Sequence, residues 1–163
     1  MANVCVNFEV LQEKHPTGME VRGRVKGIPS YVDETCCVQM SYAFNHSGAP
    51  VEDYSDVHNP VAGRKVRAFP SGGRNYIFEV SDMRFYLDKR WGQAENYTGT
   101  KDAMIAKIKG RTGVLAMGHR HIDLWLGENI HRPALYRMGY LWSNESIKLR
   151  GVFFWEVTSE FGF

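Results

Sequence analysis

The sequence has few cysteines and no long apolar run, and these absences exclude several classes of protein. Cys5, Cys36 and Cys37 are too few, and odd in number, for a disulfide framework. The longest apolar runs, Val114–Met117 and Val152–Trp155, fall far short of the roughly 20 residues of a transmembrane helix. The N-terminal stretch lacks the basic and apolar regions of a Sec signal. We therefore expect a protein made in the cytoplasm without a Sec signal and without membrane insertion.

A strong charge of one sign is also absent. Twenty Lys and Arg against 18 Asp and Glu leave a formal net charge of +2, so no nucleic-acid partner is expected. Hydrophobic residues at 44% and aromatic residues at 13% are typical of a folded chain with a core. No repeat or linker divides the 163 residues, which predicts a single domain over residues 1–163.

Hydrophobic periodicity predicts helices in the first two thirds of the chain and antiparallel strands in the last third. The expected helices are Asn7–His15 and three stretches that begin at Cys36, Ser81 and Thr100. The expected strands are Asn75–Val80, Val114–Met117, His121–Leu126 and Val152–Thr158. Residues 49–74 are predicted to be loop, and Arg22, Arg24 and Lys26 are interpreted as the solvated face of a strand. This order indicates an α+β fold.

Cys36 occupies a position that favours a nucleophile. The first turn of a helix presents free N–H groups and a positive dipole end, which stabilise a thiolate and an oxyanion. His121, on a strand far along the chain, is the leading candidate for the base. The candidates for the group that orients its imidazole are His131, Asn129 and Asp123.

Structural interpretations compete with this hypothesis. A cysteine near a helix start is more often a small buried residue, and Cys37 on the apolar face is expected to be core. His119 and His121 share a strand face and would form a zinc site with His131 or Asp123, but no ligand motif such as HExxH accompanies them. We therefore expect no metal and no cofactor. Trp125 and Phe153–Trp155 are expected in the core, and His15, His46 and His58 at the surface.

Four stretches resemble, in order and spacing, the fourth class of type VI secretion amidase effectors. Cys36–Asn45 is similar to the nucleophile helix of that family, and Arg120–Gly127 is similar to its histidine strand. Asn75–Met83 and Lys109–Leu115 resemble the segments between them. The resemblance implies a papain-like, NlpC/P60-type fold with N-terminal helices packed on an antiparallel sheet.

The resemblance also implies a function. It implies a cysteine-dependent peptidoglycan amidase, or DL-endopeptidase, that cuts the stem peptide between γ-D-glutamate and meso-diaminopimelate. The type VI apparatus would deliver this toxin into a rival's periplasm, and a cognate immunity protein would block it. The family places the nucleophile at Cys36 and the base at His121.

Three positions depart from the family pattern. Gln39 replaces the usual Arg, and Arg120 replaces the usual Gly before the histidine. The family's Asp after the Trp-x-Gly turn is missing, and His131 falls one position short of its place, which makes His131 the predicted third residue. Two alternatives remain: a housekeeping NlpC/P60-type wall hydrolase, and a non-catalytic peptidoglycan-binding module on the same fold.

Overall fold

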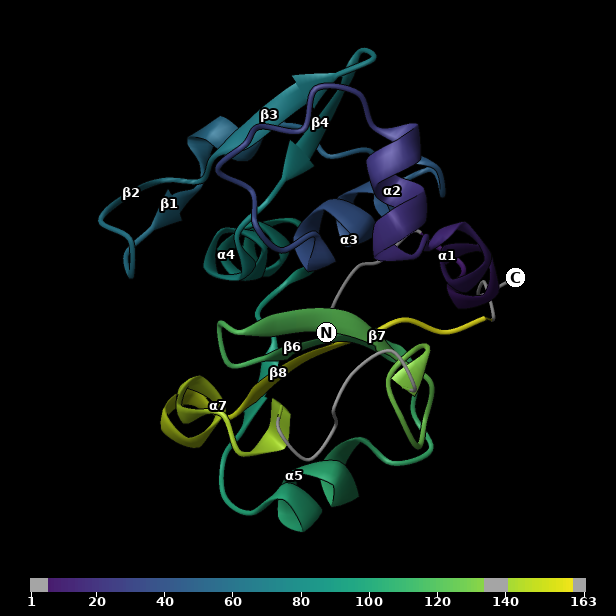
Figure 1. Cartoon of the computed structure of the whole chain (residues 1–163). Helices are drawn as coiled ribbons and strands as arrows, with labels where there is room; N and C mark the ends of the chain where they lie inside the picture. The colour runs from purple at the N-terminus through teal and green to yellow at the C-terminus, as the bar shows by residue number, and fades with distance from the viewer. Residues whose placement is uncertain (1–5, 134–140, 160–163) are drawn as a thin grey trace.

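The centre of the molecule is a four-stranded antiparallel sheet, seen in a computed structural model that describes residues 6–133 and 141–159 (Figure 1). The strand order is β5-β8-β6-β7. The four strands are β5 (Glu95–Tyr97), β8 (Val152–Glu156), β6 (Gly113–Met117) and β7 (His121–Trp125). Strand β8, the last strand among the described residues, therefore lies inside the sheet, and β7 lies at its edge.

Helices cover one face of this sheet. They are α1 (Phe8–Lys14), α3 (Cys36–Asn45) and α4 (Val80–Trp91), with α2 (Gly18–Arg24) packed against α3. Their apolar side chains share a core with alternate sheet residues such as Val114 and Ala116. This arrangement confirms the predicted α+β class with N-terminal helices on an antiparallel sheet.

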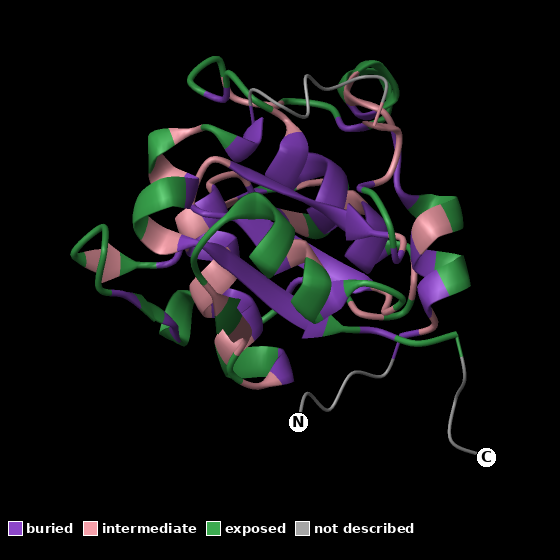
Figure 2. Ribbon diagram, turned by 90° about the horizontal axis from the view of Figure 1, so that it is seen from below, coloured by how far each residue is buried: buried purple, intermediate pink, exposed green. Residues whose placement is uncertain are grey.

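The opposite face carries a second, smaller core. Helices α5 (Lys101–Ile108) and α7 (Glu145–Arg150) pack there against Leu115 and Met117, the other alternate residues of β6. Because both faces of β6 are covered, the strand reads as a continuous apolar run rather than an alternating one. Figure 2 shows the buried sheet strands enclosed by half-exposed helices. Trp125, Phe153, Phe154 and Trp155 are buried, as predicted.

The segment expected to be loop contains short regular elements. These are the 3-10 helix η1 (Tyr54–Asp56), strands β1 (His58–Asn59) and β2 (Arg64–Lys65), and a hairpin of β3 (Ala68–Ser71) and β4 (Arg74–Ile77). The hairpin packs on α3, where the buried Ser41 hydroxyl donates to the Ile77 carbonyl and accepts from the Ile77 N–H.

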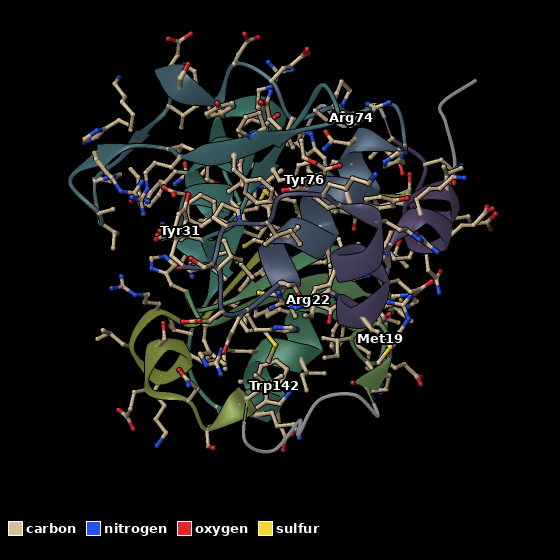
Figure 3. All side chains as sticks on the ribbon, turned by 45° about the horizontal axis from the view of Figure 1, so that its top comes forward. Met19, Arg22, Tyr31, Arg74, Tyr76 and Trp142 are labelled. Carbon is tan, nitrogen blue, oxygen red and sulfur yellow. The ribbon has the colours of Figure 1, made fainter. Side chains whose placement is uncertain are left out.

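Two further sequence-based expectations are wrong, and one helix has no counterpart among the predicted elements. The basic triplet is not a strand face, because residues 18–24 form α2, which begins with a capping box between Thr17 and Glu20. Met19 and Arg22 therefore project from a helix (Figure 3). Helix α7 was not predicted. His15 is not a surface residue, since it is 3% exposed.

Cys37 is fully buried, as predicted, whereas Cys5 lies outside the described residues. His46 and His58 are exposed, as predicted. Within residues 6–133 and 141–159, no helix is both long and apolar enough to cross a membrane.

Candidate active site

Cys36 is the first residue of α3. Thr35 precedes it as the N-cap, with no side-chain hydrogen bond to the helix end, and its carbonyl accepts the N–H of Gln39. The N–H groups of the first turn have no acceptor within a helix, so they are available to an anion. Gln39 itself has a structural contact, because its amide donates to the carbonyl of Pro16 and joins α3 to the segment before α2.

His121 is the first residue of the edge strand β7. Its register is fixed by pairing with Met117 across the turn from β6. Helix α3 packs against β7, which brings residues 85 positions apart in the chain together. Because the outer side of an edge strand has unpaired backbone groups, the Ile122 N–H is available to donate to the Cys36 sulfur.

The side chains of Cys36 and His121 hydrogen-bond to each other. Hydrogen bonds from the Cys37 thiol and from His121 outweigh burial and place the pKa of Cys36 well below its ordinary value. Burial opposes the imidazolium, but hydrogen bonds with Asp123 and Cys36 raise the pKa of His121 to about 10. The arrangement therefore stabilises a thiolate–imidazolium pair at neutral pH.

Asp123 lies two residues after His121 on the same strand, so both side chains leave β7 on the same side. Its Oδ2 is 3.0 Å from His121 Nε2, and its Oδ1 accepts the N–H of Leu124 at 2.8 Å. Burial raises the pKa of Asp123 above its ordinary value, while the hydrogen bond with His121 opposes this rise. With Nε2 directed to the carboxylate, Nδ1 is the ring nitrogen available to Cys36.

The other candidates for the third role lie elsewhere. His131 packs edge-on against His15, with ring centroids 5.4 Å apart, and burial and Arg132 lower its pKa to about 4. Asn129 is exposed in the turn after β7, where its side chain accepts the N–H of Ile130. Of the three candidates, Asp123 is the one placed against His121.

The predicted His119–His121 pair does not converge on one point. His119 contacts Arg84 at 3.1 Å, and burial together with nearby arginines lowers its pKa to about 4. Within residues 6–133 and 141–159, no group of three His, Cys, Asp or Glu side chains is arranged to hold a metal ion.

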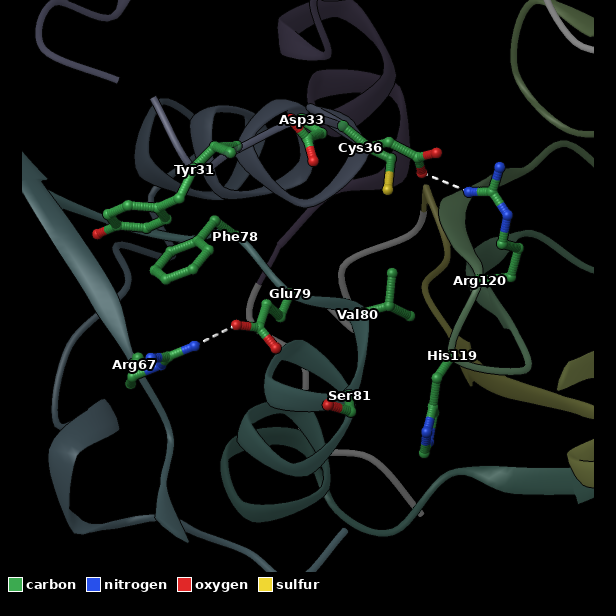
Figure 4. A pocket seen from close by; sticks show the side chains of 12 residues that line it. Tyr31, Asp33, Cys36, Arg67, Phe78, Glu79, Val80, Ser81, His119 and Arg120 are labelled. Atoms are coloured by element: carbon green, nitrogen blue, oxygen red, sulfur yellow. Dashed lines mark hydrogen bonds and ion pairs between the residues drawn. The ribbon is translucent and has the colours of Figure 1, made fainter. Parts of the chain in front are cut away.

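Two clefts open beside Cys36. One of about 570 Å³ extends toward Tyr31 and Phe78, and one of about 370 Å³ includes His121. Figure 4 shows the larger cleft, with Cys36 and Arg120 at one end and Tyr31 at the other. Among the residues that the structure describes, four line both clefts: Asp33, Glu34, Cys36 and Arg120. Asp33 and Glu34 were not predicted as site residues, and nothing in the sequence distinguishes them from surface acids.

A family model described as type VI secretion system amidase effector protein 4, Tae4, matches residues 32–155, which include Cys36, His121 and Asp123. The chain belongs to the Tae4 family. Tae4 proteins are amidase effectors of the type VI secretion system, so the predicted family, enzyme class and amidase function are confirmed. Among curated proteins, none matches this chain significantly.

Solved Tae4 structures share the fold. The Tae4–Tai4 effector–immunity complex from Enterobacter cloacae gives a TM-score of 0.69 at 16% identity, over 95% of this chain and 100% of that one. The complex from Salmonella typhimurium gives 0.69 at 17%, over 94% and 99%. Tae4 from Enterobacter cloacae alone gives 0.65 at 19%, over 97% and 100%. The predicted papain-like, NlpC/P60-type fold is thus confirmed.

Proposed function

We propose that Cys36, His121 and Asp123 form the catalytic triad of a peptidoglycan amidase that cuts the γ-D-glutamyl–meso-diaminopimelate bond. The observation that carries this proposal is the continuous hydrogen-bonded chain from the Cys36 sulfur through the imidazole to the Asp123 carboxylate. We assign the third role to Asp123 rather than to His131, which the sequence favoured, because the Asp123 carboxylate lies 3.0 Å from His121 Nε2.

The proposed reaction has two halves. The Cys36 thiolate attacks the γ-carbonyl carbon of D-glutamate, and the negative charge moves to the carbonyl oxygen, next to the free N–H groups of α3. The imidazolium of His121 donates its proton to the diaminopimelate nitrogen, and the C–N bond breaks. A water molecule then loses a proton to His121 and attacks the thioester, which releases the glutamyl carboxylate and restores the thiolate. Asp123 keeps the imidazole oriented in both halves.

The family also supports a place and a partner for this reaction. Because the family consists of type VI effectors, we expect delivery into a recipient cell and action on peptidoglycan in its periplasm. The similar structures include effector–immunity complexes with Tai4. We therefore propose a cognate immunity protein that covers the clefts beside Cys36, since occupying them would block the sulfur.

Mass spectrometry of purified disaccharide tetrapeptide tests the proposal directly. The wild-type protein should yield a disaccharide L-Ala–D-Glu product and free diaminopimelyl-D-Ala. Cys36→Ala should abolish both products and keep the wild-type unfolding midpoint, whereas the neighbouring Cys37→Ala should still cleave. If Cys37→Ala abolished cleavage and Cys36→Ala did not, the assigned nucleophile would be wrong.

A non-catalytic peptidoglycan-binding module on this fold would behave differently. Such a module has no need for a thiolate, yet the Cys37 thiol, His121 and the Ile122 N–H all converge on the Cys36 sulfur. Binding of tetrapeptide without any cleavage by the wild-type protein would favour the module over the amidase.

A further inference from the structure

The two clefts share lining residues, and these include the nucleophile and an ion pair beside it. Arg120 and Glu34 line both clefts together with Cys36, and the guanidinium of Arg120 donates to the Glu34 carboxylate. Figure 4 shows this contact as a dashed line ending at Arg120, beside Cys36. A peptide that passes from one cleft to the other therefore passes this pair.

A ligand carboxylate can displace Glu34 from Arg120, because their ion pair is partly exposed. Its side chains are 35% and 56% exposed, for Arg120 and Glu34 respectively, and ion pairs in water at this exposure contribute little to stability. A guanidinium also presents a planar fork of N–H donors that matches the geometry of a carboxylate. A ligand carboxylate enclosed in the cleft would thus compete effectively with Glu34.

The proposed substrate carries such a group near the scissile amide. The D-glutamyl residue is linked through its γ-carbonyl, which leaves its α-carboxylate free and a few bonds from the carbon that the sulfur attacks. We propose that Arg120 is a specificity-determining residue that binds this α-carboxylate, and that Glu34 holds the guanidinium in place until substrate replaces it. This inference rests on the proposed function and adds a subsite to it.

A second arginine in the larger cleft is less suited to this role. Arg67 is paired with Glu79 and lies 5.5 Å from the Phe78 ring centroid, in the part of the cleft that also includes Tyr31. Arg120 instead directly precedes His121 and borders both clefts. Because Arg120 lines both clefts together with Cys36, it is better placed than Arg67 to bind a carboxylate next to the reacting carbonyl.

Two synthetic stem peptides separate charge recognition from general binding. One carries the free α-carboxylate on D-glutamate, and the other carries the α-carboxamide of the same size. The wild-type protein should show a kcat/KM roughly tenfold higher for the carboxylate peptide. A tenfold ratio corresponds to the lower end of the free-energy range for a hydrogen bond to a charged group. Arg120→Gln should erase the preference by losing activity on the carboxylate peptide alone. Arg120→Lys should keep part of it.

Glu34→Gln should favour the carboxylate peptide, whereas Arg120→Gln should disfavour it. Removing the competing carboxylate leaves Arg120 available, so the KM for the carboxylate peptide should fall while that for the carboxamide stays unchanged. The matched controls are Arg90→Gln and Glu52→Gln, which alter an ion pair of nearly equal exposure, 34% and 56%, whose residues line other clefts. Both controls should keep the wild-type preference.

Binding to the Cys36→Ala variant, measured by calorimetry, gives the same comparison without catalysis. A carboxylate preference that Arg120→Gln removes there would support the subsite even if neither peptide were cut, in which case the proposed function alone would fail. Equal affinities for the two peptides, or an equal loss on both in a folded Arg120→Gln protein, would overturn the inference.

Discussion

At the scale of single residues, two adjacent cysteines have opposite chemistry. Hydrogen bonds lower the pKa of Cys36, whereas burial raises the pKa of Cys37 well above its ordinary value. The difference arises because the Cys37 thiol donates to the Cys36 sulfur, which stabilises one thiolate and disfavours the other. Sequence alone placed Cys36 at the helix start and Cys37 on the apolar face, but it did not show this contact.

Alkylation by iodoacetamide should report this difference, with the site identified by peptide mass spectrometry. Since only the thiolate reacts, Cys36 should be labelled at pH 6 to 7 at a nearly constant rate, and the rate should fall only in acid, as pH drops through its lowered pKa. In His121→Ala the rate should instead rise with pH toward the ordinary thiol range. A wild-type profile that rises through pH 8 to 9 would contradict a stabilised thiolate.

The choice between Asp123 and His131 gives a second prediction at this scale. Asp123→Asn keeps the side-chain size but loses the charge opposite the imidazolium, so kcat/KM for muropeptide should fall by about 10²-fold. His131→Ala should change it by less than roughly threefold, since its ring packs against His15 instead. Circular dichroism should confirm folding of both variants. A large loss of kcat/KM in His131→Ala, with little change in Asp123→Asn, would assign the third role to His131, as the sequence predicts.

At the scale of elements, periodicity located the pieces that carry the site but not every contact between them. The helix that begins at Cys36 and the strand that begins at His121 were predicted because their apolar spacing is unambiguous. Helix α2 was missed because alternating basic residues over a short stretch fit a strand as well as a helix. The sequence favours His131 for the third role because side-chain contacts cannot be read from it. In the structure the His131 N–H donates to the carbonyl of Leu124, whose side chain alternates away from that of His121. Asp123 lies beside His121 instead.

The contact between α3 and β4 gives a prediction for elements. The buried Ser41 hydroxyl satisfies both the carbonyl and the N–H of Ile77, at 3.1 and 3.0 Å. Ser41→Ala leaves two buried backbone groups without this partner, so urea unfolding should show a loss of about 1–3 kcal/mol. The control is Ser71→Ala, which loses one exposed bond to Lys26 and should cost less than about 1 kcal/mol. Equal losses would show that the helix–hairpin contact does not depend on Ser41.

At the scale of the whole molecule, three histidines from distant segments should make the fold sensitive to acid. Burial, reinforced by neighbouring charges, lowers the pKa of His15 well below its ordinary value and those of His119 and His131 to about 4. An unfolded chain takes up protons at these positions near pH 6.5, whereas the folded chain does so only at lower pH. Stability is therefore fully present above about pH 6.5 and is lost as the pH falls toward 4.

Urea unfolding at pH 7, 6 and 5 should measure this loss. Each histidine adds at most about 1.4 kcal/mol per pH unit to the slope of the unfolding free energy, and less where its ring is partly solvated. His15→Gln should lower the slope most, because His15 is the most buried of the three, while His58→Gln, at an exposed site, should leave it unchanged. The ion pair of Cys36 and His121 also loses stability in acid. This loss is the same in both variants, so it cancels when their slopes are compared. A wild-type slope equal to that of His15→Gln would mean that His15 titrates in the folded protein as it does in the unfolded chain.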